Sequence, residues 1–411
     1  MGTRDVMAPE SGRWLALLTS FATIVEAAGY GLVQSPLFED IEVFRRIGEG
    51  TDVVGKEMYD FVDRGQRHVA LRPEGTASVA RAFVQHRPAT PWKAWYATPC
   101  FRYERPQAGR YRQHHQVGIE AIGSPDPDLD VEVIAIGRDH LAALGLRRVE
   151  LLLNSMGTRD DRIRYIAVLR AWLEDRRGDL AEEDGDKIAT HPMRVLDSKR
   201  PATLAATADA PRITDHLSDE AGAHFERVQA GLASTGIDVV LEPRLVRGLD
   251  YYTHTTFELV SSSLDTAQST LVGGGRYDGL IESLGGPATA GIGLGSGIER
   301  VLLACDAEGV FPASGGAVEV FVVDVAGGAA ARDLTTELRR AGIGADRAFD
   351  GRSMRAQMKA ADRSGARVAL IVGEQEQADG TVAVRSLLDP ERTQHAVPRQ
   401  KVVAHLGELL S

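Results

Sequence analysis

The chain has 411 residues, of which 43% are hydrophobic and 26% charged, and its formal net charge is −11. This composition is ordinary for a globular protein, the length allows about two or three domains, and the negative charge argues against bulk binding to nucleic acid. The two cysteines, Cys100 and Cys305, exclude a disulfide framework and a cysteine-based zinc site, and they are typical of a reducing, cytoplasmic setting.

The N-terminal part predicts a helix, a strand and then a strand–turn–helix unit. Residues 11–28 have helical periodicity, and Trp14–Val33 is the nearest approach to a long apolar run. Glu26 interrupts that run, and acidic residues stand where a basic leader belongs, so we expect an amphipathic helix and neither a signal peptide nor a membrane span. Tyr30–Phe38 predicts a strand, and "RHVALRPEGTASVARAFVQH" predicts a strand, a turn at Pro73–Gly75 and a helix. Glu74 and Thr76 should share a face at the end of that second strand, where glycine allows close approach.

Residues Trp92–Gly123 predict an antiparallel hairpin around the Pro/Gly loop "PQAGRYR". Side chains two apart on a strand share a face, so Arg102 and Glu104 should point the same way on the first strand. The second strand presents an amide, a glycine that leaves room and a carboxylate on one face, namely Gln116, Gly118 and Glu120. A half-buried strand tolerates such a face where a polar ligand docks, while exposed salt bridges on an edge hairpin are the alternative.

The middle of the chain changes character. Residues 129–145 predict a helix and 147–153 a strand, whereas the stretch from about 158 to 235 is helical, charged and poor in turns. We therefore predict an inserted helical subdomain between two β-rich halves. Strand patterns return afterwards, at 239–242, 254–260 and 268–274.

The segment "AGIGLGSGIERVLLA" predicts a strand that runs into a helix. Its glycines at 291, 293, 295 and 297 remove every second side chain from one strand face, so a flat ring could lie against the sheet. Arg300 follows on the first helical turn, and a guanidinium can both stack on a base and pair with phosphate.

The last quarter of the chain predicts a second domain. Phe311–Ala317 has the composition of a linker, and the β-α-β-α-β spacing after it predicts a small α/β domain with a parallel or mixed sheet. Between Arg332 and Arg367 there are nine Lys/Arg against five Asp/Glu, a local basic stripe. A phosphate footprint and a solvated helix face explain this stripe equally well.

Three candidate motifs fail on their chemistry. "GTDVVGK" resembles the start of a phosphate-binding loop, but Glu57 stands where a serine or threonine hydroxyl is needed. "GIGLGSGIER" lacks the third glycine of a dinucleotide-binding turn in every register. His114 and His115 are adjacent on a strand, so they point to opposite faces and cannot ligate one metal ion together.

The surviving motifs carry a family resemblance. "FRYERPQAGRYRQHHQVGIEAIG" resembles the second signature of class II aminoacyl-tRNA synthetases, "GIGLGSGIER" the third, and "YGLVQSPLFED" the first, which forms dimers. "LRPEGT" and above all "LVRGLDYYTHTTFE" resemble histidyl-tRNA synthetases. "GTRDVMAPES", "IGEGTDVVGKEMYDFVD", "MRVLDSK" and "GRSMRAQMKAADRSGARVALIVGEQE" agree, so the resemblance extends from Gly2 to about Leu406.

The resemblance implies nucleotide-binding roles. It places Arg102 at the α-phosphate of ATP, Glu104 at the adenine amino group and Arg110 at the phosphates. Arg300 would clamp adenine and the γ-phosphate side. Arg247 would face Arg102 across the α-phosphate while the histidine carboxylate attacks, which makes these two arginines the implied catalytic pair.

It also implies a histidine pocket. The α-amino group would meet Glu74 and Thr76, the backbone end Gln116, and the imidazole Glu120 and Tyr252. The implied histidine-binding set is Glu74, Gly75, Thr76, Gln116, Glu120, Tyr251, Tyr252 and Tyr277.

The expected fold class is α+β: a class II synthetase-type antiparallel sheet flanked by helices in residues 1–316, with the helical insertion, followed by an α/β anticodon-binding domain in 318–411. The expected activity is that of a histidine–tRNA ligase, with L-histidine, ATP with Mg²⁺, and tRNA-His as substrates and partners, a homodimer as the assembly and no membrane association. The residues from Arg110 to Arg112, in the loop of the second signature, would approach the acceptor end of the tRNA.

Two alternatives belong to other classes. A non-catalytic regulatory subunit of ATP phosphoribosyltransferase would resemble the catalytic core but lack the arginine–tyrosine signature and the tRNA-binding domain, both of which this chain has. A stand-alone RNA-binding module would have no use for an intact nucleotide pocket. The chain departs from the family pattern at His191, at His114 and in its short segment before "GTRD", and none of these touches an expected ligand.

Overall fold

The computed structural model describes residues 2–46, 48, 51–248, 250–264, 269–312, 318–389, 391 and 393–410. The chain separates into two compact units, one of Met1–Val6 and Trp14–Pro312, the other of Met7–Arg13 and Ala313–Ser411. Most of the predicted linker Phe311–Ala317 lies outside the described residues. Among the described residues, no helix is both long enough and apolar enough to cross a bilayer.

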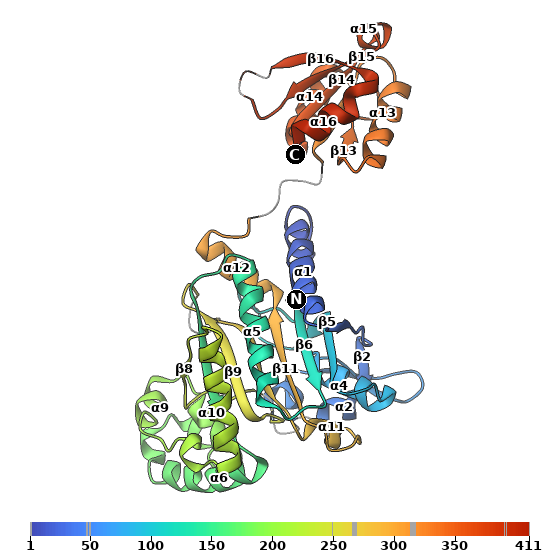
Figure 1. The fold of residues 1–411 in the computed structure, drawn as a ribbon. Helices are drawn as coiled ribbons and strands as arrows, with labels where there is room; N and C mark the ends of the chain where they lie inside the picture. Colours follow the sequence, from blue (N-terminus) through green and yellow to red (C-terminus); the bar gives the residue numbers. More distant parts are fainter. Residues whose placement is uncertain are drawn as a thin grey trace. The chain divides into compact units, whose positions relative to one another are not determined.

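An eight-stranded sheet organises the first unit, with the strand order β1-β5-β6-β11-β10-β9-β7-β8 (Figure 1). The pairs β1–β5 and β7–β8 are parallel, and the pairs between them are antiparallel. The strands are β1 (Gly31–Leu32), β5 (Trp92–Phe101), β6 (Gln113–Ile122), β7 (Val149–Ser155), β8 (Val240–Leu241), β9 (Thr253–Ser261), β10 (Thr270–Arg276) and β11 (Gly291–Gly297). The predicted antiparallel hairpin is therefore the pair β5–β6.

Four helices pack their apolar side chains on this sheet: α1 (Glu10–Ala27), α5 (Pro127–Ala143), α10 (Asp219–Ser234) and α12 (Ile298–Glu308). Local sequence sets their ends. Asp126 caps α5 by accepting the N–H of Asp128, and proline occupies the first helical turn. Ser218 caps α10 in the same way. The buried faces meet the strands in one core, to which Phe21, Ile134 and Phe257 belong.

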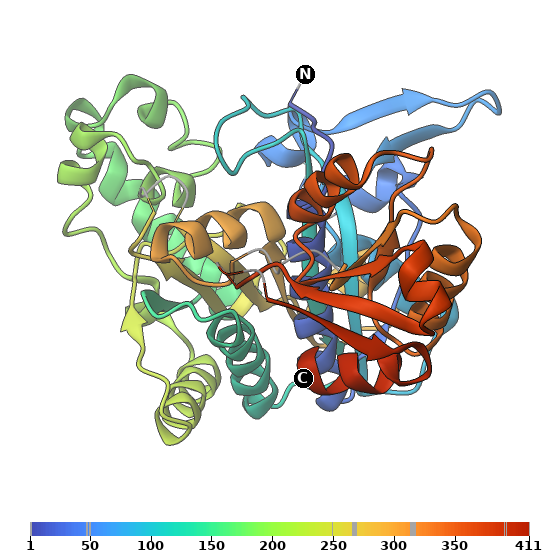
Figure 2. The ribbon, with the colours of Figure 1, turned by 90° about the horizontal axis from the view of Figure 1, so that it is seen from above.

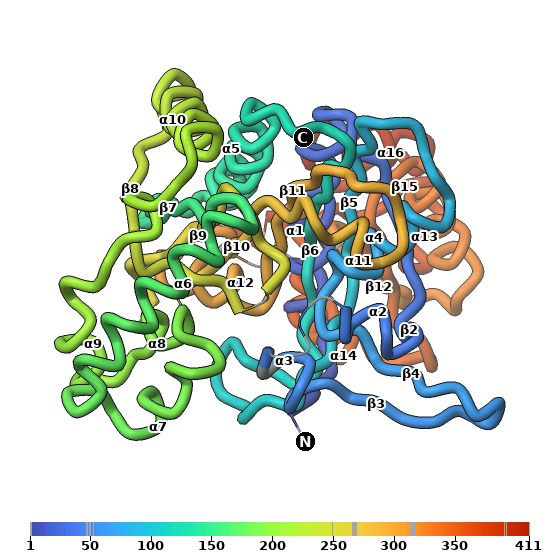
Figure 3. Tube along the Cα trace, turned by 90° about the horizontal axis from the view of Figure 1, so that it is seen from below, coloured from blue at the N-terminus to red at the C-terminus, as the bar shows by residue number. Residues whose placement is uncertain are grey.

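Every element between β7 and β8 is helical. Besides α10, the segment contains α6 (Arg159–Glu174), α7 (Glu182–Gly185), α8 (Met193–Leu196), α9 (Pro201–Ala206) and two 3₁₀ turns, Arg177–Asp179 and Ile213–His216. A reciprocal capping box between Thr158 and Asp161 starts α6. Helices α6 to α9 form a lobe with its own core around Tyr165 and Leu169, set apart from α5 (Figure 3).

The predicted strand Tyr30–Phe38 is wrong over most of its length. Only Gly31–Leu32 pairs with the large sheet, and Phe38–Asp40 forms β2 in a separate three-stranded sheet of order β2-β4-β3. The buried guanidinium of Arg72 accounts for the break, because it donates to the carbonyl oxygens of Ser35 and Pro36 and so takes acceptors that a strand would use. The remaining elements here are β3 (Tyr59–Val62), β4 (His68–Leu71), α2 (Ile41–Arg45), α3 (Asp52–Gly55), α4 (Thr76–His86) and α11 (Leu280–Ser283).

The second unit has a mixed five-stranded sheet of order β13-β12-β14-β15-β16 (Figure 2). The first three strands are parallel, and β15 and β16 add antiparallel neighbours. Its elements are β12 (Val320–Asp324), α13 (Ala329–Arg340), β13 (Ala345–Arg347), α14 (Met354–Ser364), β14 (Val368–Val372), α15 (Glu374–Ala378), β15 (Thr381–Ser386), β16 (Gln394–Pro398), a 3₁₀ turn Arg399–Lys401 and α16 (Val402–Leu410).

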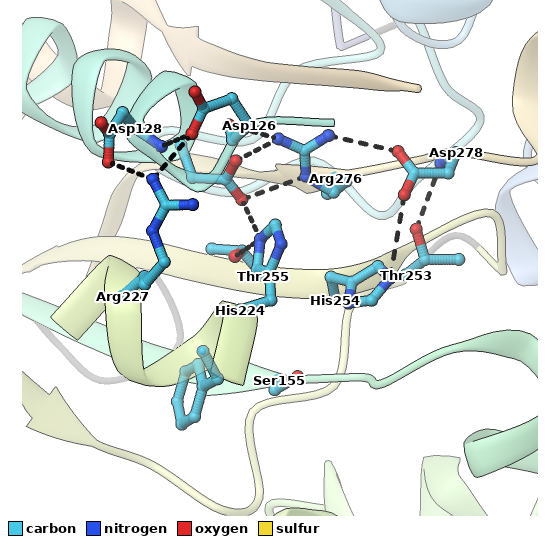
Figure 4. Close-up of polar contacts among 12 residues, drawn as sticks. Asp126, Asp128, Ser155, His224, Arg227, Thr253, His254, Thr255, Arg276 and Asp278 are labelled. Carbon is cyan, nitrogen blue, oxygen red and sulfur yellow. Dashed lines mark hydrogen bonds and ion pairs between the residues drawn. The ribbon is translucent and has the colours of Figure 1, made fainter. Parts of the chain in front are cut away.

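A buried ionic cluster ties β10 to α5 and α10 in the first unit (Figure 4). Arg276 and Asp130 are both fully buried, and the guanidinium donates to both carboxylate oxygens. His224 of α10 contacts the same carboxylate at 3.2 Å. Burial alone would raise the pKa of Asp130, but the hydrogen bonds from His224 and Arg276 outweigh it and lower that pKa.

Replacing Asp130 with alanine should lower the free energy of unfolding by about 3–5 kcal/mol, because it leaves a buried guanidinium without its carboxylate. Denaturant unfolding followed by circular dichroism measures this. Asp128→Ala is the matched control, since Asp128 is exposed and pairs only at the surface with Arg227, where an ion pair is worth about 0–1 kcal/mol. Equal losses in the two variants would contradict the assignment.

Candidate functional site

A cavity of about 250 Å³ lies over β6, β11 and β10 and is lined mainly by charged side chains. Its arginines come from separate parts of the chain: Arg102 and Arg110 from the β5–β6 connection, Arg247 from the loop before β9, and Arg300 from the first turn of α12. Its carboxylates are Glu104, Glu258 and Glu299. Four arginines against three glutamates leave an excess of positive charge on the cavity wall, which suits an anionic ligand.

The hairpin end differs from the sequence prediction in detail. Strand β5 ends at Phe101, so Arg102 and Glu104 do not alternate on a strand but lie in the turn that follows. Arg102 donates to the carbonyl oxygen of Pro73 at 2.9 Å, and Arg110 pairs with Glu104 at 2.9 Å. Both arginines nevertheless line the cavity, because the antiparallel register of β5 and β6 brings the loop back over the sheet.

Arg300 and His114 also line this cavity. Arg300 donates to the carbonyl oxygen of Thr270 at 2.9 Å, and burial together with nearby Arg110 lowers its pKa. His114 lines the cavity, and His115, next along β6, instead contacts the Trp14 ring and the Glu299 carboxylate. Burial lowers the pKa of His114 to about 3, so this ring adds no positive charge.

Arg247 lies against β10 and faces the same cavity as Arg102. It forms an ion pair with Glu258, whose other oxygen accepts a hydrogen bond from Thr270 at 2.8 Å. A Cβ atom at Gly273 would lie 2.3 Å from the guanidinium, so glycine is required there. Burial opposes the charge of Arg247, but Glu258 outweighs it and raises the pKa. The cation is therefore permanent and held in place.

A second group of side chains adjoins the cavity around Glu120. This carboxyl group is fully buried, and its partners are hydroxyl groups, those of Thr76 at 2.7 Å, Tyr277 at 2.5 Å and Tyr96 at 3.5 Å. Burial raises the pKa of Glu120 to about 8 although the hydrogen bonds from Tyr277 and Thr76 oppose this. A ligand that donates an N–H group or brings a positive charge would stabilise the ionised form.

Glu74 and Thr76 meet at the start of α4. They do not share a strand face as predicted, because β4 ends at Leu71 and Thr76 is already helical. The carboxylate of Glu74 accepts the backbone N–H groups of Thr76 at 2.7 Å and Ala77 at 2.8 Å, and so caps the helix. Burial raises the pKa of Glu74. Two buried carboxyl groups, those of Glu74 and Glu120, are thus linked through Thr76.

Three tyrosines, Tyr277, Tyr251 and Tyr252, extend this group of side chains from Glu120. The hydroxyl groups of Tyr251 and Tyr252 are 3.5 Å apart, and the rings of Tyr251 and Tyr277 meet edge to face at 5.9 Å. The Tyr252 ring lies 5.8 Å from the Arg247 guanidinium. The two parts of the site meet at Gly295, which lines the charged cavity together with Gln116: a Cβ there would lie 3.7 Å from the Tyr96 hydroxyl group and 3.9 Å from the Gln116 amide oxygen.

The glycines on β11 and β6 leave room mainly for the protein's own side chains. At Gly291 a Cβ would meet the Tyr277 ring at 2.4 Å, and at Gly293 it would meet the Glu120 carboxylate at 1.8 Å. Only Gly295 and Gly297 of the four-glycine series line the cavity, and a Cβ at either would make no close contact, so the predicted platform for a flat ring is half as long as expected. Gly118 likewise accommodates Tyr96 rather than a ligand.

Sequence reasoning missed two residues of this site. Tyr96 is buried between Gly75 and Gly118 with its hydroxyl group toward Glu120. Its segment predicts an ordinary core strand, so no local signal was available. Glu258, the partner of Arg247, had a signal: a carboxylate at a strand position between apolar residues, in the same segment as the arginine.

An antiparallel sheet that holds arginines from a hairpin, a loop and a helix start around one cavity defines the fold and site of a class II aminoacyl-tRNA synthetase. The family model described as "Histidyl-tRNA synthetase" matches residues 2–301, and one described as "Anticodon binding domain" matches residues 317–409. The chain belongs to the histidyl-tRNA synthetase family.

Individual relatives agree over the full length. A histidine–tRNA ligase from Rhodococcus erythropolis is 48% identical, with 100% of this chain and 97% of the relative covered. The crystal structure of the S. aureus histidyl-tRNA synthetase in its apo form has a TM-score of 0.81 at 35% identity, with 98% of each chain covered. A structure from Bacillus halodurans C titled as an ATP phosphoribosyltransferase regulatory subunit/histidyl-tRNA synthetase has a TM-score of 0.60 at 20% identity and covers 84% of this chain and 91% of its own, so it shows the fold alone.

Proposed function

We propose that the protein is a histidine–tRNA ligase, which joins L-histidine to ATP, releases pyrophosphate and transfers histidine to the 3′ end of tRNA-His. The observation that carries the proposal is that Arg102 and Arg247 line one cavity close to the buried carboxyl group of Glu120, since a Cβ at Gly295 on the cavity wall would lie 3.7 Å from the Tyr96 hydroxyl group, a partner of Glu120. The full-length relatives named as histidine–tRNA ligases support it.

The charged cavity would hold ATP. The four arginines of this cavity are suited to the phosphates of a triphosphate. The backbone at Gly295 and Gly297, which carries no side chain and lies near Arg300, is suited to adenine. Glu104 would accept the adenine amino group. The proposed ATP-binding residues are Arg102, Glu104, Arg110 and Arg300.

The adjoining pocket would hold histidine. Glu74 and Thr76 suit the α-ammonium group, and Gln116, on the cavity side, suits the carboxylate end. Glu120 with its phenol partners suits the ring N–H groups. The proposed histidine-binding residues are Glu74, Gly75, Thr76, Gln116, Glu120, Tyr251, Tyr252 and Tyr277.

Catalysis would be electrostatic. A histidine carboxylate oxygen attacks the α-phosphorus, the bond to the bridging oxygen of the β-phosphate breaks, and pyrophosphate leaves with the electron pair. Arg102 and Arg247 would neutralise the charge that develops on the equatorial oxygens, from positions fixed beforehand by Pro73 and Glu258. A ribose hydroxyl of the terminal adenosine then attacks the activated carbonyl carbon, and AMP leaves.

Magnesium bound with ATP would neutralise phosphate charge. The residues fit an ion carried by the nucleotide, because within the described part of the chain no three or more His, Cys, Asp or Glu side chains converge as a metal site. Mg²⁺ bound to nucleotides is typically held by phosphates, waters and one or two carboxylates. The cavity wall offers three carboxylates for this, those of Glu104, Glu258 and Glu299.

Other parts of the chain have surface properties that suit the binding of tRNA and of a second copy of the chain. The unit matched by the anticodon-binding model has the basic stretch Arg332–Arg367, which suits the anticodon stem-loop. In the first unit, exposed apolar side chains gather on β1 and on the small sheet and suit a homodimer contact: Leu32, Leu37, Phe38, Phe61 and Val62.

ATP–pyrophosphate exchange with the purified chain and each amino acid in turn tests the proposal. We expect exchange with histidine alone, at a rate that synthetase chemistry requires, about 1 s⁻¹ or faster. Exchange with another amino acid, or with none, would overturn it. Association with an ATP phosphoribosyltransferase in place of exchange would instead favour the regulatory-subunit alternative.

A further inference from the structure

Asp278 directly follows Tyr277 and connects three strands behind the Glu120 pocket. Its carboxylate accepts the backbone N–H of Gly291 in β11 at 3.2 Å and pairs with Arg276 of β10 at 3.4 Å. Its own backbone N–H donates to the hydroxyl group of Thr253, the first residue of β9, at 3.1 Å. In Figure 4 the carboxylate lies between Arg276 and His254, and the distance from Asp278 Oδ2 to His254 Nε2 is 3.9 Å.

These contacts hold the backbone on both sides of the Tyr277 side chain. The Tyr277 backbone N–H donates to the carbonyl oxygen of Gly291 at 2.7 Å, and Asp278 accepts the N–H of the same glycine. The Tyr277 ring fills the space above Gly291 and its hydroxyl group reaches Glu120. Any shift of Asp278 relative to Gly291 therefore moves the phenol that contacts the buried carboxyl group.

The same residue acts on the neighbouring loop. Thr253 follows Tyr252, and its hydroxyl group is held by Asp278. His254, next along β9, has a φ of 44°, a conformation rare for a side chain with a Cβ, which the surrounding contacts must maintain. Tyr277 and Tyr252 are thus both tied to Asp278, the first through the contact of its carboxylate with Gly291 and the second through the contact of its backbone N–H with Thr253.

We infer that Asp278, through its contacts with Arg276, Gly291 and Thr253, is a positioning residue that sets the affinity for the amino-acid side chain by spacing Tyr277 and Tyr252 around Glu120. The inference rests on the proposed function, because it takes histidine to be the ligand that Tyr277, Tyr252 and Glu120 contact. ATP binds on the other side of the site, among arginines that Asp278 does not contact, so its binding is independent of Asp278.

Asp278→Ala should raise KM for histidine in ATP–pyrophosphate exchange by about 10- to 100-fold and change KM for ATP by less than about twofold, since a misplacement of about 1 Å at a reacting site has effects of this size. Asp278→Asn keeps an oxygen for the Gly291 N–H and should recover most of the loss. Thr253→Val, a milder change, should shift KM for histidine in the same direction by about 3- to 10-fold. Asp128→Ala, the surface carboxylate in Figure 4, should change neither constant.

A double-mutant cycle separates positioning from general damage. In a Tyr277→Phe background, Asp278→Ala should add less than about threefold, because the lost carboxylate acts through the Tyr277 hydroxyl group, which is already gone, while the backbone contact with Thr253 is kept. Equal changes in both KM values, or a full multiplicative effect in that background, would overturn the inference. Thr253→Val repeats the cycle if Asp278→Ala does not fold. Absence of histidine-dependent exchange in the unsubstituted chain would refute the proposed function instead.

Discussion

Arg247→Ala is expected to slow histidine-dependent ATP–pyrophosphate exchange by about 10²–10³-fold, the effect of losing one preorganised donor at a developing anion. Arg247 is half-buried against Gly273 and oriented by Glu258, so its charge faces the cavity without rearrangement. Its partner Arg102 remains, which is why the loss should be partial. The decrease should appear in kcat, because the charge that Arg247 meets grows in the transition state.

Two further variants bound this prediction. Arg247→Lys keeps the charge but loses the planar fork, so its rate should lie between those of the unsubstituted chain and Arg247→Ala. Arg227→Ala removes an exposed arginine on α10 and should leave the rate unchanged. A rate for Arg247→Ala within a few-fold of the unsubstituted chain would refute the catalytic role of Arg247.

The sequence predicted those parts of the site that depend on local pattern. The alternation of Trp92–Gly123 around a Pro/Gly loop predicted the β5–β6 hairpin, and the glycine-rich segment before Arg300 predicted a strand that runs into a helix. In both cases the strand periodicity and the turn-forming residues predict the same structure, so the prediction depends little on the rest of the chain. The positions of Arg102 and Arg300 on one cavity then follow from the pairing of β6 with β11.

Other features depend on which strands become neighbours, and no local pattern contains this. The space above Gly293 is filled by Glu120 because β11 pairs with β6 in that register, and the space above Gly118 is filled by Tyr96 from β5. A missing side chain shows that something approaches the backbone, but not whether it is a ligand or the protein itself.

Tertiary hydrogen bonds also override local propensity. Tyr30–Phe38 has the composition of a strand, yet Arg72, far along the chain, takes two of its carbonyl oxygens. The shared face predicted for Glu74 and Thr76 fails for a related reason, because the carboxylate caps a helix that begins two residues later. A buried polar side chain that satisfies backbone groups can thus end a strand where its sequence would continue.

Selectivity for histidine over β-(2-thienyl)alanine is expected to be about 10⁴–10⁵ in kcat/KM, because that five-membered ring has no nitrogen. The buried Glu120 carboxyl group and the Tyr277 hydroxyl group would then face an apolar ring with their hydrogen bonds to the substrate unmade. Desolvated polar groups left unpaired in this way are costly, whereas shape alone discriminates only weakly. Exchange kinetics with both amino acids measure the ratio.

Glu120→Leu is expected to collapse this ratio to about 10–200, the range of a pocket that selects by shape. Histidine should lose kcat/KM because its ring nitrogens meet a side chain without acceptors, while thienylalanine should gain. Tyr30→Phe is the matched control: it removes a buried phenol–carboxylate contact with Glu132, 3.0 Å long, elsewhere in the same unit, and should leave the ratio unchanged. If Glu120→Leu keeps the full ratio, the nitrogen-reading group is not Glu120, and Glu74 would be the remaining buried carboxyl group able to serve.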